Sequence, residues 1–285
     1  MSFLKVGSTN LHYQLLENRT HTGNSAVVVF LHGLIMDNLS SWFFTLANPV
    51  AQNYDVLLYD MRGHGFSDRP RSGYAIEDHR EDLRTLLDHI VPHKKVILVG
   101  NSFGGLLALN FAKTYADRVQ GLVLVDAQVN NTEWREMMLN SFSLEGSERD
   151  QVITQNFQNW LGRSSKRKSS KLAMNAEDLL YKTTLLDDVR SATLMTDEDI
   201  RSIAAPTHAI YGGESDILTT AMNLSRLMPQ CNLRVVEDAS HSVLWEKTDL
   251  VKEWIIQAIE SLQELTAATV VLPYRKSPSF TRELQ

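Results

Sequence analysis

A serine stands among three glycines at residues 100–105, where the sequence reads GNSFGG. The apolar run VILV precedes this segment, and LLALNFA, whose composition is typical of a helix, follows it directly. Because glycine tolerates tight turns that other residues avoid, such a turn between a strand and a helix can lift the Ser102 hydroxyl clear of the backbone. We therefore predict that Ser102 is a nucleophile; a glycine turn with a purely structural role is the alternative.

A serine nucleophile requires a general base, and the base requires an acid that orients it. Two downstream residues have the right types and lie after predicted strands, namely Asp216 in GGESD and His241 in DASH. The carboxyl ends of parallel strands meet at one edge of a sheet, where catalytic groups gather. We predict His241 as the base and Asp216 as the acid. Asp126, which follows the run LVLV, is the alternative acid.

Acyl transfer also requires donors for the negative oxygen that develops on the attacked carbonyl. The backbone N–H of Phe103, directly after the serine, is one predicted donor. The second is the backbone N–H of Leu34, in the segment FLHGLIMDN. Nearby polar residues are assigned structural roles: His32 is expected to brace this segment, and residues 60–67, DMRGHGFS, are expected to form a loop after a strand.

The elements that position these residues alternate along the chain. Short apolar runs at 27–31, 56–59, 96–99, 122–125 and 208–211 are nearly continuous, as in strands covered on both faces. Stretches with helical periodicity, such as residues 76–90, lie between most of them. The sequence therefore predicts an α/β fold with a mostly parallel central sheet flanked by helices on both faces. The first strands, FLKV and LHYQLL, are predicted to form an antiparallel hairpin.

The alternation stops between residues 127 and 200, where the sequence is typical of helices. We predict a helical cap over 127–200, a core formed by 1–126 and 201–265, and a tail at 266–285. An apolar stripe in the cap includes Trp134, Met138 and Trp160, which we expect to contact a hydrophobic substrate, although such a stripe also suits a plain core.

The segment GRSSKRKSSK contains Lys166, Arg167 and Lys168 and no acid. A solvated loop is one interpretation. The second interpretation is a docking surface for an acyl carrier protein or a coenzyme A thioester, both of which carry negative charge.

The composition excludes several classes of protein. The 285 residues are 43% hydrophobic and 22% charged, as in a globular chain, and the net charge of −6 disfavours binding to nucleic acid. No apolar stretch has the length of a membrane span, and the first residues lack the apolar core of a signal peptide. With Cys231 as the single cysteine, we expect a cytoplasmic protein without disulfides. No metal motif or nucleotide-binding motif is present, so we predict neither a metal nor a cofactor.

FLHG, DMRGHGFS, GNSFGG, GGESD and ASH together resemble the α/β-hydrolase superfamily over about residues 1–265. The resemblance implies a serine hydrolase that forms an acyl-enzyme, and the apolar cap favours an ester or thioester with a hydrophobic acyl group. An aspartate nucleophile, as in haloalkane dehalogenases and epoxide hydrolases, is disfavoured because serine stands at position 102.

The same resemblance is compatible with three further functions. The segment GNSFGG is similar to that of hydrolases that cleave carbon–carbon bonds with the same triad. An accessory thioesterase of a fatty-acid or natural-product pathway would use the basic segment to dock its substrate. A non-catalytic binding module on a hydrolase fold is the third function, and the complete triad argues against it.

Overall fold

The computed structural model describes residues 1–20, 26–35, 37–142 and 175–270, with side chains described as far as residue 265. An eight-stranded sheet lies at the centre, in the order β1-β2-β4-β3-β5-β6-β7-β8. Strand β2 is antiparallel to β1 and to β4, and all other neighbours are parallel. This arrangement confirms the predicted hairpin and the predicted α/β class.

The strands are β1 (Ser2–Val6), β2 (Thr9–Leu16), β3 (Val27–Leu31), β4 (Asp55–Tyr59), β5 (Val96–Asn101), β6 (Val119–Val125), β7 (Thr207–Gly212) and β8 (Cys231–Val236). The helices are α1 (Ser40–Trp42), the π-helix η1 (Phe43–Ala47), α2 (Asn48–Val50), α3 (Ile76–Ile90), α4 (Phe103–Thr114), the 3-10 helix η2 (Ala116–Arg118), α5 (Thr132–Phe142), α8 (Leu185–Ser191), α9 (Asp197–Ser202), α10 (Leu218–Leu227), α11 (Val243–Glu246) and α12 (Thr248–Val270). Residues 175–181 are also helical.

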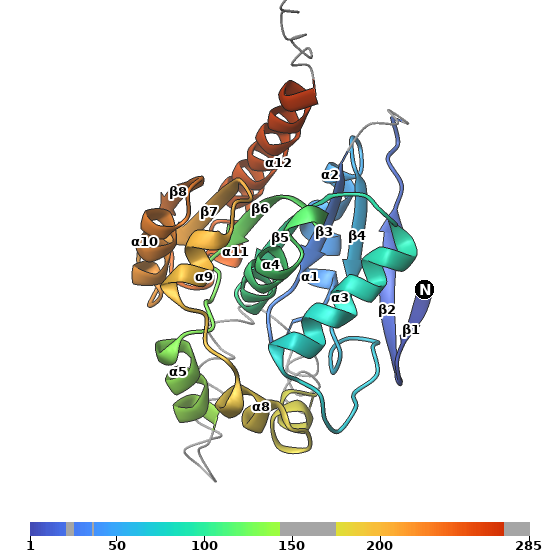
Figure 1. The fold of residues 1–285 in the computed structure, drawn as a ribbon, viewed down its shortest axis with the longest axis vertical. Helices are drawn as coiled ribbons and strands as arrows, with labels where there is room; N and C mark the ends of the chain where they lie inside the picture. The colour runs from blue at the N-terminus through green and yellow to red at the C-terminus, as the bar shows by residue number, and fades with distance from the viewer. Residues whose placement is uncertain (21–25, 36, 143–174, 271–285) are drawn as a thin grey trace, which may run out of the picture.

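The central strands are apolar on both faces because helices cover both faces. In β3, Val27, Val29 and Leu31 join the apolar cluster on one side of the sheet, and Val28 and Phe30 join the cluster on the other. Helices α3, α4 and α10 cover the first side, whereas η1, α11 and α12 cover the second. The continuous apolar runs in the sequence are therefore explained by two-sided burial (Figure 1).

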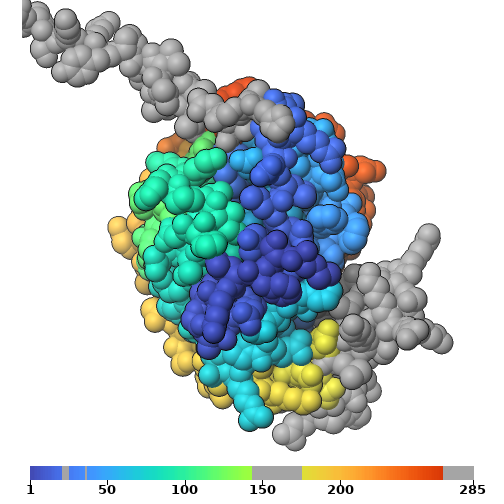
Figure 2. Space-filling view, turned by 90° about the vertical axis from the view of Figure 1, so that its right-hand side faces the viewer, coloured from blue at the N-terminus to red at the C-terminus, as the bar shows by residue number. Residues whose placement is uncertain are grey.

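The helices between β6 and β7 lie at the end of the sheet, with α5 and α8 farthest from it (Figure 1). Hydrogen bonds join α8 and the residue before it to the loop that precedes α3. The N–H of Tyr74 donates to Asp188 Oδ2 at 2.8 Å, and the N–H of Thr184 donates to the carbonyl of Arg71 at 3.0 Å. Figure 2 shows this contact, with residues near 180 in yellow against the loop near 70 in cyan.

A second set of hydrogen bonds joins the two segments of chain that connect these helices to β6 and β7. The Asn130 amide donates to the carbonyl of Thr193 at 2.7 Å, and the N–H of Met195 donates to the carbonyl of Asn130 at 2.7 Å. The guanidinium of Arg135 donates to the carbonyl of Ala192. The chain therefore leaves and re-enters the sheet through one hydrogen-bonded junction.

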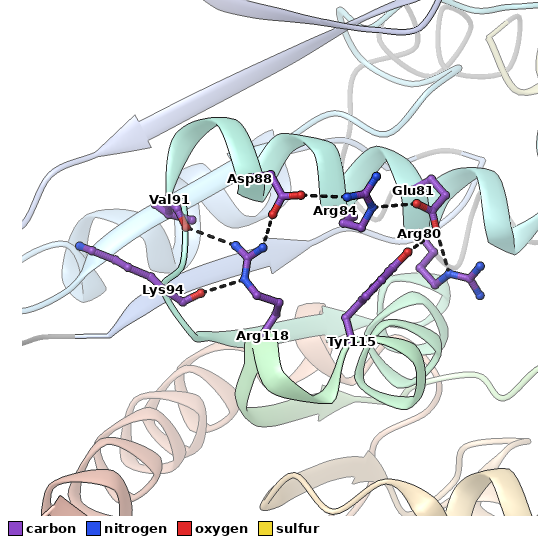
Figure 3. A network of polar contacts seen from close by, with 8 residues as sticks. All are labelled: Arg80, Glu81, Arg84, Asp88, Val91, Lys94, Tyr115 and Arg118. Carbon is purple, nitrogen blue, oxygen red and sulfur yellow. Dashed lines mark hydrogen bonds and ion pairs between the residues drawn. The ribbon is translucent and has the colours of Figure 1, made fainter.

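A surface network on α3 fixes this helix to the turn after α4 (Figure 3). Arg84 lies between Glu81 and Asp88, at 2.9 and 3.0 Å, and the Tyr115 hydroxyl donates to Glu81 at 2.5 Å. Arg118 pairs with Asp88 and also donates to the carbonyls of Val91 and Lys94, which follow α3. The network stabilises the packing of α3 against α4 on the surface of the molecule. Within the described ranges, no helix is long and apolar enough to cross a membrane.

Candidate active site

Ser102 occupies a strained turn between β5 and α4, with φ 51° and ψ −116°. Two glycines, Gly100 and Gly104, make this turn possible. A Cβ on Gly100 would lie 2.4 Å from the carbonyl oxygen of Gly104, and a Cβ on Gly104 would lie 2.2 Å from the carbonyl oxygen of Leu31. A side chain at Gly100 would push the start of α4 away from the end of β5, and one at Gly104 would push it away from β3. The glycines therefore explain why the sharp turn can sit against the sheet.

His241 lies within hydrogen-bonding distance of this serine. The distance between Ser102 Oγ and His241 Nε2 is 3.1 Å. The histidine follows β8 in a loop that passes directly over the end of β7, where a Cβ on Gly212 would lie 2.4 Å from the carbonyl oxygen of Ser240. Glu246 fixes the same loop, because its carboxylate accepts from the N–H of Ser240 at 2.7 Å and from its hydroxyl at 2.8 Å. The structure thus brings together two of the three residues predicted for the triad.

The third member of the hydrogen-bonded chain is Asp126, which corrects the prediction of Asp216. His241 Nδ1 lies 2.6 Å from Asp126 Oδ2. Asp126 is fully buried, and its carboxylate also accepts from the N–H of Gly212 at 2.8 Å and from the hydroxyl of Ser215 at 2.6 Å. Asp216 is exposed at the surface, next to this arrangement but without a hydrogen bond to the imidazole among the described residues.

The local backbone explains why Asp126 reaches the histidine. Asp126 directly follows β6 and has φ 44°, a left-handed conformation that aspartate tolerates better than most residues. The turn is held from both sides: the Tyr211 hydroxyl donates to the carbonyl of Ala127 at 2.8 Å, and the N–H of Gln128 donates to the carbonyl of Ser102 at 3.1 Å. The loop after β7, from which the acid was expected, instead supplies the donors that hold the acid from β6.

The contacts fix the tautomer of His241. Nδ1–H donates to the carboxylate, so Nε2 is free to accept the proton of the Ser102 hydroxyl. Burial alone would lower the pKa of His241, but the hydrogen bond and negative charge of Asp126, with a further contribution from the charge of Asp216, raise it above 6.5. The side chain of His241 remains 27% exposed, whereas that of Asp126 is 0% exposed. This arrangement suits a base that accepts a proton from Ser102.

The segment after β3 presents a backbone N–H that has no acceptor among the residues that the structure describes. The N–H of Gly33 donates to Asp37 Oδ2 at 2.8 Å, and the N–H of Ile35 donates to His64 Nε2 at 2.9 Å. Between them, the N–H of Leu34 has no acceptor among the described residues, and the same holds for the N–H of Phe103. These are the two donors predicted for an oxyanion, and α4 begins against the segment that carries Leu34.

Two neutral histidines fix the conformation of this segment. His32 Nε2 accepts from the N–H of Met61 at 3.0 Å, so its Nδ1–H donates to the carbonyl of Gly33 at 2.7 Å. His64 has the same tautomer, donating to the carbonyl of Arg62 at 2.9 Å, and burial lowers its pKa to about 3. The bracing role expected for His32 is confirmed. The sequence did not reveal the role of His64. Its Nε2 accepts from the N–H of Ile35 and so holds Ile35 at a φ of 74°, which β-branched residues rarely adopt.

The predicted substrate-contacting residues lie in different parts of the chain. Trp134 and Met138, both on α5, are buried in the same apolar cluster as Leu34 and Phe103. The ring of Trp134 stacks on that of Phe103, with centroids 6.2 Å apart. Trp160 lies outside the described residues, as do Lys166, Arg167 and Lys168. The helical segment after β6 therefore places an aromatic side chain against the residue that follows Ser102.

No group of three histidine, cysteine or acidic residues within the described ranges is arranged to hold a metal ion. The chemistry that the described residues support is nucleophilic attack by Ser102, assisted by His241 and Asp126. The sequence signal for Asp126 was its position after a buried strand. Asp216 also follows a strand and was the preferred prediction, and the three-dimensional contacts are what distinguish the two.

Comparison with known proteins establishes the family. The sequence matches the alpha/beta hydrolase fold family over residues 26–207, more than half of the chain. The protein therefore belongs to this family and is an α/β hydrolase. A proline iminopeptidase from Pestalotiopsis fici is 27% identical over 91% of this chain and 99% of its own length. An uncharacterised protein of Mycobacterium tuberculosis is 35% identical over 105 residues, and this match spans 37% of the chain but only 30% of that relative.

Solved structures share the fold at lower identity. The enol-lactonase from Burkholderia xenovorans has a TM-score of 0.67 and 22% identity, covering 90% of this chain and 98% of the lactonase. A meta-cleavage product hydrolase from Pseudomonas fluorescens has a TM-score of 0.70 and 21% identity, covering 92% of this chain and 98% of that hydrolase. These similarities extend over nearly the whole chain and show the fold.

Proposed function

We propose that the protein is a serine hydrolase that cleaves an ester or thioester of a hydrophobic acyl group through an acyl-enzyme. The observation that carries the proposal is the continuous chain of hydrogen bonds from Ser102 Oγ to His241 Nε2, at 3.1 Å, and from His241 Nδ1 to Asp126 Oδ2, at 2.6 Å. A nucleophile, a base and a buried acid in this order are the parts that acyl transfer requires.

In the proposed reaction, His241 takes the proton of Ser102 as the Oγ attacks the acyl carbon. Asp126 stabilises the imidazolium that forms, and the N–H groups of Leu34 and Phe103 donate to the oxyanion. His241 then gives its proton to the leaving group, and a water molecule, activated by the same histidine, hydrolyses the acyl-enzyme. Each oxyanion donor is expected to contribute about 3–4 kcal/mol to stabilising the transition state.

The apolar surroundings of Phe103 support a hydrophobic acyl group. Trp134, Met138 and Leu34 lie in the same buried cluster, and none of these side chains carries a charge. The fold-level similarity to an enol-lactonase adds support for oxygen esters, since a lactone is a cyclic ester. The basic residues Lys166, Arg167 and Lys168 support a thioester on a carrier protein or coenzyme A, which would make the protein an accessory thioesterase.

Two other reactions use the same residues. The similarity to a meta-cleavage product hydrolase supports carbon–carbon bond cleavage of a vinylogous diketone acid, with the same nucleophile and base. The similarity to a proline iminopeptidase supports hydrolysis of an amide next to an N-terminal proline. Both require recognition of a charged group, either a carboxylate or an ammonium, which a hydrophobic acyl ester lacks.

The experiment measures kcat/KM for one medium-length acyl group presented as an aryl ester and as a pantetheine thioester. A proline anilide and a vinylogous diketone acid are measured in parallel, and Ser102→Ala is the control. We expect the acyl ester or thioester to be the best substrate, with a loss of at least about a thousandfold in Ser102→Ala. Wild-type turnover in that variant would refute the serine mechanism. A faster reaction of the anilide or the diketone acid would show that the proposed substrate class is wrong.

If the thioester is preferred, the role of the basic residues can be tested directly. Exchanging Lys166, Arg167 and Lys168 for glutamates should lower kcat/KM for a carrier-linked thioester and leave the rate on the short pantetheine thioester unchanged. Equal effects on both substrates would exclude carrier docking at this segment.

A further inference from the structure

Ser215 makes a buried contact with Asp126 that the proposed mechanism does not use. Its side chain is buried, with 8% of the residue exposed, and its hydroxyl lies 2.6 Å from Asp126 Oδ2. The same oxygen is 2.6 Å from His241 Nδ1. The N–H of Ile217 donates to Ser215 Oγ at 3.3 Å, so the serine proton is directed to the carboxylate. Two donors therefore share one oxygen of a fully buried acid.

We propose that Ser215 is a positioning residue that acts on the reaction through Asp126, by sharing with His241 one oxygen of the buried carboxylate. This inference rests on the proposed function in that it assigns the catalytic acid to Asp126. The hydroxyl has two effects. Together with the N–H of Gly212, which donates to Oδ1, it fixes the plane of the carboxylate. By donating to Oδ2, it also weakens the attraction between the carboxylate charge and the imidazole.

Burial makes the second effect measurable. Asp126 is 0% exposed, so bulk water does not replace a donor that is removed. Without the serine hydroxyl, more of the negative charge on Oδ2 is available to the imidazolium form of His241. Removing this hydroxyl is therefore expected to raise the pKa of His241 above its value in the wild-type protein.

The neighbouring residue provides a control with the opposite sign. The charged groups that act on His241 are Asp126 and Asp216, and the exposed charge of Asp216 raises the pKa of the imidazole. The ionisable group facing Asp126 from β7 is the phenol of Tyr211, whose hydroxyl donates to the carbonyl of Ala127. Removing the charge of Asp216 is therefore expected to lower the pKa of His241, and added salt should reduce this effect because the group is exposed.

The experiment titrates His241 by NMR in the resting enzyme, using His241→Gln to assign its signals. Ser215→Ala is compared with wild type and with Asp216→Asn. We expect the midpoint to rise by roughly half a unit in Ser215→Ala and to fall in Asp216→Asn. We also expect the downfield Nδ1–H proton signal of His241 to move in Ser215→Ala. An unchanged midpoint, or a fall in Ser215→Ala, would overturn the proposal.

Ser215→Cys separates loss of the hydrogen bond from loss of packing, because a thiol fills the site but donates weakly. We expect its midpoint to lie between those of wild type and Ser215→Ala; a wild-type midpoint in Ser215→Cys would overturn the proposal even if Ser215→Ala fails to fold. For turnover, we expect about a tenfold lower kcat in Ser215→Ala with little change in KM. Since the NMR titration requires no substrate, failure of the proposed function would appear only in the turnover assay.

Discussion

Gly105 lies directly against Ala127: a Cβ on Gly105 would stand 2.2 Å from the methyl carbon of Ala127. This contact joins the first turn of α4, which follows the nucleophile, to the turn that follows Asp126. Because Gly105 has no side chain, the turn that carries Ser102 and the turn that carries Asp126 can pack directly against each other.

A paired substitution tests this spacing. Gly105→Ala should destabilise the protein by about 1–3 kcal/mol, because the added methyl must displace a backbone turn that is otherwise closely packed. Ala127→Gly in the same chain should restore most of the stability and the activity. The measurement is Tm with kcat/KM for the single and double variants; a double variant no better than Gly105→Ala would show that the contact is not the cause.

The pH dependence of activity should report His241. Because Asp126 holds the imidazole pKa above 6.5, the free enzyme carries a protonated, inactive base at and below that pH. We expect kcat/KM to rise with pH through an acid limb centred above 6.5 and then to reach a plateau. An acid limb centred below 6.5 would contradict the assignment of Asp126 as the partner of His241.

His64 should influence the reaction without contacting substrate. In His64→Phe, the N–H of Ile35 loses its acceptor, and the strained segment that carries Leu34 can relax. We expect kcat to fall by about tenfold or more, with a smaller change in KM.

A matched control for His64→Phe comes from the surface network of Figure 3. Arg118→Ala removes the contacts of η2 with Asp88 on α3 and with Val91 and Lys94 after it, at the opposite end of α4 from Ser102. It should lower Tm without changing kcat. If both variants reduce kcat in proportion to their loss of stability, the effect of His64 is only structural.

Buried histidines should make the protein acid-sensitive. Burial, aided by the charge of Arg62, lowers the pKa of His79 well below 6.5, and both ring nitrogens lack a hydrogen-bond partner among the described residues. The unfolded chain then binds a proton that the folded protein does not, so this contribution to stability is present above about pH 6.5 and is lost as the pH falls. Each such histidine contributes a slope of at most about 1.4 kcal/mol per pH unit.

His79→Met should remove this slope, whereas His89→Met, at an exposed position on the same helix, should retain it. Free energies of unfolding between pH 4.5 and 8 provide the measurement. Identical pH slopes in the two variants would show that His79 is not the source.

Much of the architecture could be predicted because burial on both faces of a sheet requires apolar composition. Strands covered on both faces require continuous apolar runs, so β3 was predicted with the observed bounds, and the spacing of leucines predicted α3 with its observed bounds, residues 76–90. The proximity of Ser102 and His241 could be predicted because glycines around the serine, and a polar loop after a strand, mark positions at the sheet edge.

The sequence analysis predicted Asp216 as the acid, whereas in the structure Asp126 is the carboxylate hydrogen-bonded to His241. Asp126 and Asp216 both follow strands, and their difference lies in a left-handed φ at Asp126 and in the donors that Gly212 and Ser215 direct at it. Neither a positive φ at a non-glycine residue nor the direction of a hydroxyl is visible in residue types. The same limit applies to Ile35, whose β-branched side chain argues against the conformation it adopts.

The most direct test of the central claim compares kcat/KM of Asp126→Asn and Asp216→Asn on the best ester substrate, with folding checked by Tm. The account predicts a loss of about 10⁴-fold for Asp126→Asn, because the asparagine no longer holds the required tautomer of His241, and a loss of less than about tenfold for Asp216→Asn. A severe loss in Asp216→Asn together with an active Asp126→Asn would contradict it.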